Sequence, residues 1–281
     1  MALGALFALA ITVVYSEHRK STLEELVVRS EKFEVGLVQP NHWIGEGSPM
    51  EDLFDYQKMI SELVESQSLD LVVWPESAVR TPPGLFLSSR GPGGSGEPGF
   101  PLDVQEIRQS SLQPGPDFAG DRAPSVERLS IQRGHKTPIL FGTALLDTDP
   151  EAEEPVPGRA PTYNCAVLLD ESGKVVGAAA KVKLLLFGET VPLASYFPSV
   201  YRLIPLASAL LPGEGPTTLK LRQARLGVMI CYEDILPWFH FSLARQNPQV
   251  LMNLTNDAWF GKTAEAEAHL ALAKLRAVEG R

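Results

Sequence analysis

Short apolar runs separated by polar, Gly- and Pro-containing stretches dominate the pattern of this chain. Residues 33–40 alternate between apolar and polar positions and end on a proline, which predicts a strand. After Ser48 and Pro49, an apolar stripe at helical spacing predicts an amphipathic helix that covers a sheet. Further strands are predicted at residues 71–75, 138–146, 162–170, 175–181 and 226–230. The stretch 249–261 predicts one more strand, which ends in polar groups just before Trp259 and Phe260. This alternation indicates an α/β fold.

Two stretches depart from the pattern and set the expected domain boundaries. Residues 1–20 begin with an apolar run of about 15 residues, shorter than the about 20 that a spanning helix needs. We expect a membrane-helix remnant there, a polar linker at 21–32 and one domain at 33–281. Within this domain, the Gly-, Pro- and Ser-rich residues 82–120 predict a long loop without regular structure.

Reactive side chains follow several of the predicted strands. Glu76 comes directly after Pro75, Lys181 ends an almost uncharged small-residue strand, and Cys231 ends the buried run at 226–230. Open sheets collect their chemistry at strand ends. The helical pattern after Cys231 suggests that a helix N-terminus lowers the thiol pKa, which would make it a nucleophile. The alternative is that Cys231 is a small core residue.

Charge and composition exclude several classes of function. The 281 residues carry a net charge of −9 and a pI near 5.2, without the basic face that a nucleic-acid partner requires. Two cysteines, Cys165 and Cys231, cannot build a disulfide scaffold. The five histidines show no ligand spacing, so we expect neither a metal nor another cofactor.

Several of these stretches taken together resemble the carbon-nitrogen hydrolase (nitrilase) superfamily. The matching stretches are Trp74-Pro-Glu-Ser77, Lys181 six residues before Phe187-Gly-Glu189, Cys231-Tyr-Glu233 and residues 253–261. More narrowly, they are similar to its membrane-bound branch, the apolipoprotein N-acyltransferases. The resemblance implies an α-β-β-α sandwich. It also implies a chain that lacks most membrane helices and the C-terminal end of the family's domain.

Acyl transfer to nitrogen needs a nucleophile, a base and positive charge at the developing oxyanion. We assign these roles to Cys231, Glu76 and Lys181. The backbone N–H of Tyr232, at the start of the expected helix, is the second oxyanion donor. By resemblance, Glu189 and Glu233 support the triad; the alternative for both is a structural ion pair.

The resemblance implies that Cys231 takes a fatty acyl chain from a phospholipid and passes it to a diacylglyceryl-cysteine lipoprotein. The resemblance places this reaction at the bacterial inner membrane, with the catalytic domain facing the periplasm. Water must be kept from the thioester, and the apolar residues 191–211, Trp259 and Phe260 are candidates. Residues 191–211 could instead form a helix that plugs the core. The alternative functions are a soluble amidase or nitrilase and an inactive lipid- or partner-binding remnant.

Overall fold

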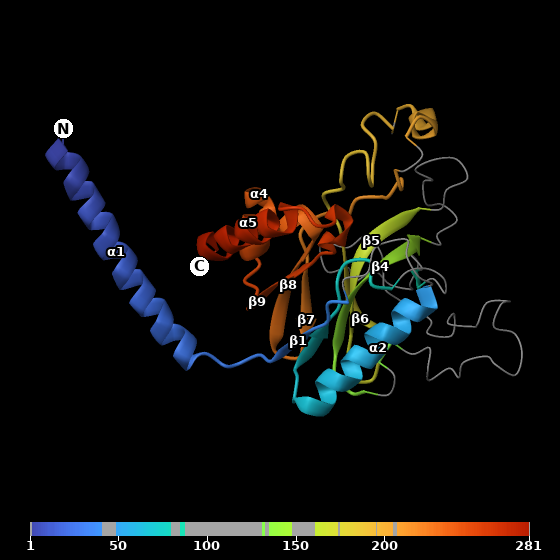
Figure 1. Ribbon diagram of the computed structural model, residues 1–281, viewed down its shortest axis with the longest axis horizontal. Coiled ribbons are helices and arrows are strands. Elements are labelled where there is room, and N and C mark those ends of the chain that lie inside the picture. Colours follow the sequence, from blue (N-terminus) through green and yellow to red (C-terminus); the bar gives the residue numbers. More distant parts are fainter. Residues whose placement is uncertain are drawn as a thin grey trace, which may run out of the picture. The chain divides into compact units, whose positions relative to one another are not determined.

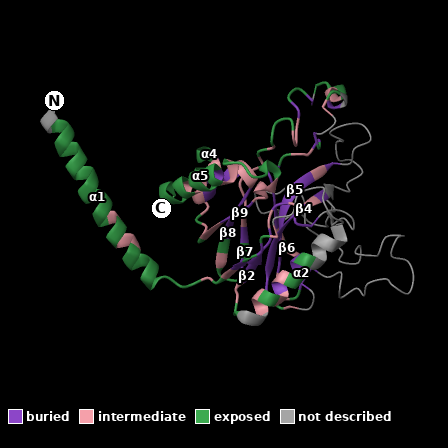
Figure 2. Cartoon of the chain, viewed as in Figure 1, coloured by how far each residue is buried: buried purple, intermediate pink, exposed green. Residues whose placement is uncertain are grey.

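The computed structural model describes residues 2–40, 49–79, 85–87, 131–132, 135–147, 161–173, 175–194, 196–204 and 207–280. The chain divides into two compact units, Met1–Glu34 and Val35–Arg281. The first unit is the helix α1 (Ala2–Arg29), which exposes large apolar side chains such as Leu6, Phe7 and Val14 (Figure 2). Residues 21–29, expected in a linker, continue this helix. Among the described residues, no helix combines the length and the apolar character needed to cross a membrane.

The second unit begins with a six-stranded mixed sheet (Figure 1). Its strands are β1 (Val35–Leu37), β2 (Leu71–Val73), β4 (Ile139–Asp147), β5 (Thr162–Leu169) and β6 (Val175–Ala180), in this order, with β3 (Leu85–Leu87) paired to β4. The first three are parallel, and β4, β5 and β6 are antiparallel neighbours. The prediction of no regular structure in residues 82–120 is therefore wrong at β3; the remainder of that stretch lies outside the described residues.

A second sheet contains the strand that leads to Cys231. It consists of β7 (Thr218–Leu221), β8 (Ala224–Ile230) and β9 (Val250–Leu254), with β8 in the centre. Leu226 to Ile230 are all buried, because β8 has neighbours on both edges and is covered on both faces. The predicted buried strand is therefore confirmed.

Helices cover the outer faces of the two sheets (Figure 1). On the first sheet, α2 (Pro49–Ser66) packs Tyr56 and Ile60 into the same core as Trp74. On the second, α4 (Pro237–Ala244) packs Phe239 and Leu243 against Met229 of β8. Strand β6 lies against β7, and β5 against β8. The layers are α-β-β-α, as expected, because each sheet buries one apolar face against the other and one under helices.

The described residues 191–194, 196–204 and 207–211 form an arm outside the two sheets (Figure 1). Its regular structure within the described residues is the short 3-10 helix η3 (Pro198–Arg202). Val191, Tyr201 and Ala207 belong to a small apolar cluster of the arm's own. The arm therefore does not place a helix in the main core, and that alternative is wrong.

Candidate active site

Glu76 lies in the turn that follows β2, and its side chain is almost fully buried. The turn sits directly on Gly142 of β4, whose N–H donates to the carbonyl of Pro75 at 3.2 Å. A Cβ on Gly142 would lie 2.6 Å from the Cα of Glu76 and 2.7 Å from the nitrogen of Ser77. The absence of a side chain at Gly142 therefore allows the backbone of the Glu76 turn to lie this close to β4.

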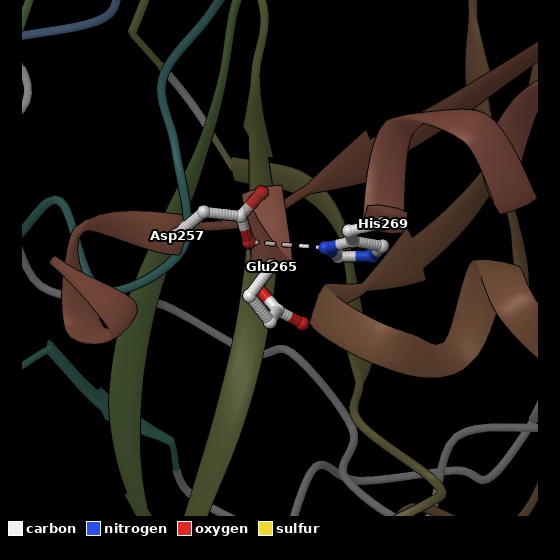
Figure 3. Close-up of side chains that lie close together, drawn as sticks. All are labelled: Asp257, Glu265 and His269. Carbon is white, nitrogen blue, oxygen red and sulfur yellow. Dashed lines mark hydrogen bonds and ion pairs between the residues drawn. The ribbon is translucent and has the colours of Figure 1, made fainter. Parts of the chain in front are cut away.

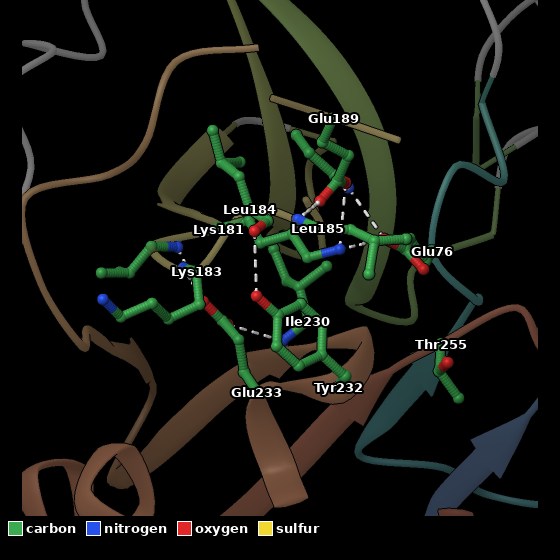
Figure 4. A network of polar contacts seen from close by, with 12 residues as sticks. Glu76, Lys181, Lys183, Leu184, Leu185, Glu189, Ile230, Tyr232, Glu233 and Thr255 are labelled. Carbon is green, nitrogen blue, oxygen red and sulfur yellow. Dashed lines mark hydrogen bonds and ion pairs between the residues drawn. The ribbon is translucent and has the colours of Figure 1, made fainter. Parts of the chain in front are cut away.

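Lys181 follows β6 and reaches the same point from the neighbouring hairpin (Figure 4). Its N–H donates to the carbonyl of Asn164 at 2.8 Å, and its side chain is 1% exposed. The ammonium Nζ lies 3.0 Å from Oε1 of Glu76 and 3.0 Å from Oε1 of Glu189. Burial alone lowers the pKa of Lys181, but the charges of Glu76, Cys231 and Glu189 outweigh it and raise the pKa above its ordinary value.

Asn164 belongs to the same cluster as Glu76, Lys181 and Glu189, and it was not predicted from the sequence. Its Nδ2 donates to Oε1 of Glu76 at 2.8 Å and to Oε1 of Glu189 at 2.9 Å. The sequence carried one signal, a single amide inside the otherwise apolar strand β5. A buried amide needs partners. Together, the Asn164 amide and the Lys181 ammonium bond to both Glu76 and Glu189, which allows these two carboxylates to lie close together in a buried site.

The turn at residues 185–190 carries Glu189 into the site. The N–H of Leu185 donates to Oε2 of Glu189 at 2.7 Å, and Phe187 adopts a left-handed backbone with φ of 67°. Both oxygens of Glu189 are therefore bonded, one to the turn and one to Lys181 and Asn164. Lys183 is exposed and lies over Trp238, 5.1 Å from its ring centroid, away from the carboxylates.

Cys231 is the first residue of the 3-10 helix η4 (Cys231–Ile235), directly after β8. Its φ of 56° is left-handed, which is rare for a residue with a side chain and is concentrated at functional sites. Burial, followed by the charge of Glu76, raises the thiol pKa to about 12. Lys181 and the backbone N–H of Tyr232, which hydrogen bonds to Cys231, act in the opposite direction. The expected lowered pKa is wrong, because one 3-10 turn cannot offset the burial.

Tyr232 holds the two halves of the site together through its side chain. Its hydroxyl donates to the carbonyl of Leu184 at 3.0 Å, and its ring centroid lies 5.6 Å from Nζ of Lys181 (Figure 4). The ring thus forms one wall beside the ammonium. The backbone N–H of Tyr232 hydrogen bonds to the Cys231 thiol.

Glu233 is buried and accepts three backbone hydrogen bonds (Figure 4). Its Oε1 accepts from Val182 at 2.7 Å and from Lys183 at 2.9 Å, and its Oε2 accepts from Ile230 at 2.9 Å. Burial raises its pKa to about 7, although these three bonds favour the charged form. Glu233 ties the end of β8 to the segment after Lys181; the ion pair considered as an alternative for Glu233 is not formed among the described residues.

Trp259 and Phe260 lie in another 3-10 turn, η5 (Asp257–Phe260), which follows β9. Their side chains are 55% and 41% exposed, so both can contact a ligand at the surface. Their role in a lipid pocket stays a prediction.

One cluster of potential metal ligands occurs in the described part of the chain. Side-chain ligand atoms of Asp257, Glu265 and His269 lie within 4.8 Å of one another (Figure 3). Glu265 and His269 lie one turn apart on the helix α5 (Glu265–Glu279), and Asp257 comes from η5. The expectation of no ligand spacing among the histidines overlooked this i, i+4 pair. Both ring nitrogens of His269 already lie at hydrogen-bond distance from carboxylates, so a metal would have to displace one of them. The prediction of no metal stays a prediction.

Comparison with known proteins identifies the family. Residues 34–281 match the carbon-nitrogen hydrolase family model. This chain belongs to the carbon-nitrogen hydrolase family. Nit3 from Saccharomyces cerevisiae, a member of branch 10 of the nitrilase superfamily, has the same fold, with a TM-score of 0.52 and 20% identity over 89% of this chain and 73% of Nit3.

Among curated proteins, this carbon-nitrogen hydrolase is similar to apolipoprotein N-acyltransferases. Apolipoprotein N-acyltransferase from Geobacter metallireducens is 28% identical over 98% of this chain and 45% of the relative. The protein of the same name from Bdellovibrio bacteriovorus is 38% identical over 51% of this chain and 26% of the relative. The chain thus spans less than half the length of these relatives.

Proposed function

We propose that this chain is the catalytic domain of an apolipoprotein N-acyltransferase. Glu76, Lys181 and Cys231 meet at the ends of strands from two sheets, and Cys231 is within electrostatic range of both charged groups. This convergence carries the proposal, and the similarity to proteins of that name supports it. The substrates are a phospholipid acyl donor and a lipoprotein with an N-terminal diacylglyceryl-cysteine.

In the first half-reaction, Cys231 forms a thioester. Glu76 takes the thiol proton, the sulfur attacks the ester carbonyl of the phospholipid, and a C–S bond forms as the ester C–O bond breaks. The proton on Glu76 then passes to the leaving alkoxide, which departs as the alcohol of a lysophospholipid. Because the resting thiol pKa is raised, proton transfer coupled to attack suits this site better than a preformed thiolate.

In the second half-reaction, the lipoprotein amine attacks the thioester. A C–N bond forms, the C–S bond breaks, Glu76 takes the amine proton, and the thiol is restored. Each step develops negative charge on the former carbonyl oxygen. Lys181 and the backbone N–H of Tyr232 are the donors that we assign to this oxygen, in a buried site where such interactions are strong.

The arm at residues 191–211 supports a lipid substrate. Its base is tied to the catalytic turn, since the N–H of Ser208 donates to the carbonyl of Gly188 at 2.8 Å and that of Leu210 to Glu189 at 2.9 Å. Its outer face exposes large apolar side chains: Leu193, Tyr196, Phe197 and Leu203. Exposed apolar surface beside a reactive site fits acyl chains and a bilayer, and it excludes water from a thioester. We expect the site to work at the bacterial inner membrane, facing the periplasm.

Intact-protein mass spectrometry tests this function. The detergent-solubilised chain is incubated with phosphatidylethanolamine, and the wild type is compared with Cys231→Ala. We expect a mass gain of one fatty acyl group that hydroxylamine releases and that is absent from the variant. Cleavage of a small amide through Cys231 without any lipid adduct would indicate an amidase instead. No reaction with either substrate would indicate a remnant that only binds.

A further inference from the structure

Asp234 anchors the turn of Cys231 to segments other than those that Glu233 contacts. Its Oδ2 accepts a hydrogen bond from Nδ2 of Asn253 in β9 at 2.7 Å, and its Oδ1 lies 2.9 Å from Nε2 of His269. Asp234 is 3% exposed and His269 7%. Consecutive carboxylates therefore hold the turn from two directions. A left-handed residue such as Cys231 persists only where its surroundings fix it in this way.

The other nitrogen of His269 connects to a second turn (Figure 3). Its Nδ1 lies 3.0 Å from Oδ1 of Asp257, the first residue of η5, and the same oxygen accepts from the hydroxyl of Thr255 at 2.9 Å. One imidazole ring thus joins η4, which begins with Cys231, to η5, which carries Trp259.

The two hydrogen bonds determine the charge of the ring. A neutral imidazole has one N–H and can donate only once, whereas an imidazolium donates from both nitrogens. Burial alone lowers the pKa of His269, but the hydrogen bonds and charges of Asp234 and Asp257 outweigh it and raise the pKa. Glu265, whose carboxylate belongs to the same cluster, adds further negative charge. The charged groups that face the ring are therefore Asp234 from η4, Asp257 from η5 and Glu265 from α5 (Glu265–Glu279).

We infer that His269 is a positioning residue: as an imidazolium, it clamps the turn of the nucleophile Cys231 to the turn of Trp259 and Phe260. The inference rests on the proposed role of Cys231, but not on the identity of the acyl donor. The clamp keeps the sulfur and the apolar side chains of η5 in a fixed relationship during both half-reactions.

Hydrogen exchange of the full chain, followed by mass spectrometry of peptides, tests the clamp. In His269→Gln we expect residues 231–235 and 257–260 to exchange together about tenfold faster, the scale that loss of one charge-assisted hydrogen bond allows. Acylation by phosphatidylethanolamine, where it occurs, slows in kcat with little change in KM.

His240→Gln is the matched control. His240 is a fully buried histidine of α4 that packs beside Gly280 at the end of α5, without a hydrogen bond to either turn among the described residues. Faster exchange at only one turn, or equal loosening by His240→Gln, would overturn the inference. If His269→Gln does not fold, Asp257→Asn provides the test, with a smaller but still joint loosening expected; unchanged turns in this variant would also overturn it. These readouts need no lipid, so they remain decisive if the proposed acyl transfer fails.

Discussion

Asn164 donates one hydrogen bond to Glu76, at 2.8 Å, across 88 positions of sequence. The same Nδ2 also reaches Glu189 at 2.9 Å. The proposed general base is therefore held by an amide as well as by Lys181. This arrangement orients the carboxylate without adding charge, which leaves the balance of two carboxylates and one ammonium unchanged.

Replacing Asn164 by Leu removes both hydrogen bonds and keeps the approximate volume. We expect thioester formation to slow about ten- to hundredfold, because hydrogen bonds to charged groups contribute about 1.5–3 kcal/mol. Asn164→Asp should be slower still, since it adds a third carboxylate to the site. The rate of acyl-enzyme formation with phosphatidylethanolamine measures both effects. A wild-type rate in Asn164→Leu would contradict the orienting role.

Gly142→Ala tests the close approach of the Glu76 turn to β4. The new Cβ would meet backbone atoms of Glu76 and Ser77 at 2.6–2.7 Å, so the turn must move. We expect a loss of about 1–3 kcal/mol in the free energy of unfolding, together with slower acylation. Gly215→Ala is the control, because nothing lies within 4 Å of its Cβ position. Urea denaturation of both variants makes the comparison, and equal stabilities would count against a steric role.

Lys181→Met should destabilise the chain, because Glu76 and Glu189 would be left together without their cation. Removing one partner of a buried ion pair costs about 3–5 kcal/mol in the free energy of unfolding. The pairs here are buried, because the side chains of Lys181, Glu76 and Glu189 are 1%, 7% and 14% exposed. We expect the double variant Lys181→Met with Glu76→Gln to recover part of this loss. Lys183→Met, which removes an exposed lysine over Trp238, should cost less than about 1 kcal/mol. Unfolding in urea distinguishes these cases, and equal losses at the two lysines would contradict the prediction.

The reactivity of the Cys231 thiol should increase with pH. Since its thiol pKa is raised to about 12, the thiolate fraction and the rate of alkylation by iodoacetamide should keep rising above pH 9 without a plateau. The charge of Glu76 contributes to the raised pKa, so Glu76→Gln should move the profile to lower pH while abolishing acyl transfer.

Peptide mass spectrometry follows alkylation at Cys231. Cys165, whose thiol is fully buried with a strongly raised pKa, provides the unreactive internal reference. A plateau below pH 8, or a shift to higher pH in Glu76→Gln, would show that burial and the Glu76 charge do not control the thiol.

Local patterns in the sequence predicted most strands, the α/β class and the residue types of the site, whereas the α-β-β-α layering was implied by the family resemblance. An apolar run that ends on Cys231, or on Pro75 before Glu76, is a local signal, because burial of a strand requires contiguous apolar positions. The order of these motifs also sufficed for the family resemblance. Even so, β3 and β7 were not predicted. The three residues of β3 lie in a stretch of loop composition.

Which polar groups meet, and what charge they carry, depends on how the two sheets pack. His269 and Gly142 have no local pattern that marks them, and the single amide of Asn164 in β5 does not reveal its partners, since each acts on a segment distant in sequence. The thiol pKa was predicted in the wrong direction for the same reason: burial and the charge of Glu76 come from the packed fold, whereas the sequence suggested only the start of a helix. Electrostatics in a buried site depends on distances and exposure, and these exist only once the two sheets have packed.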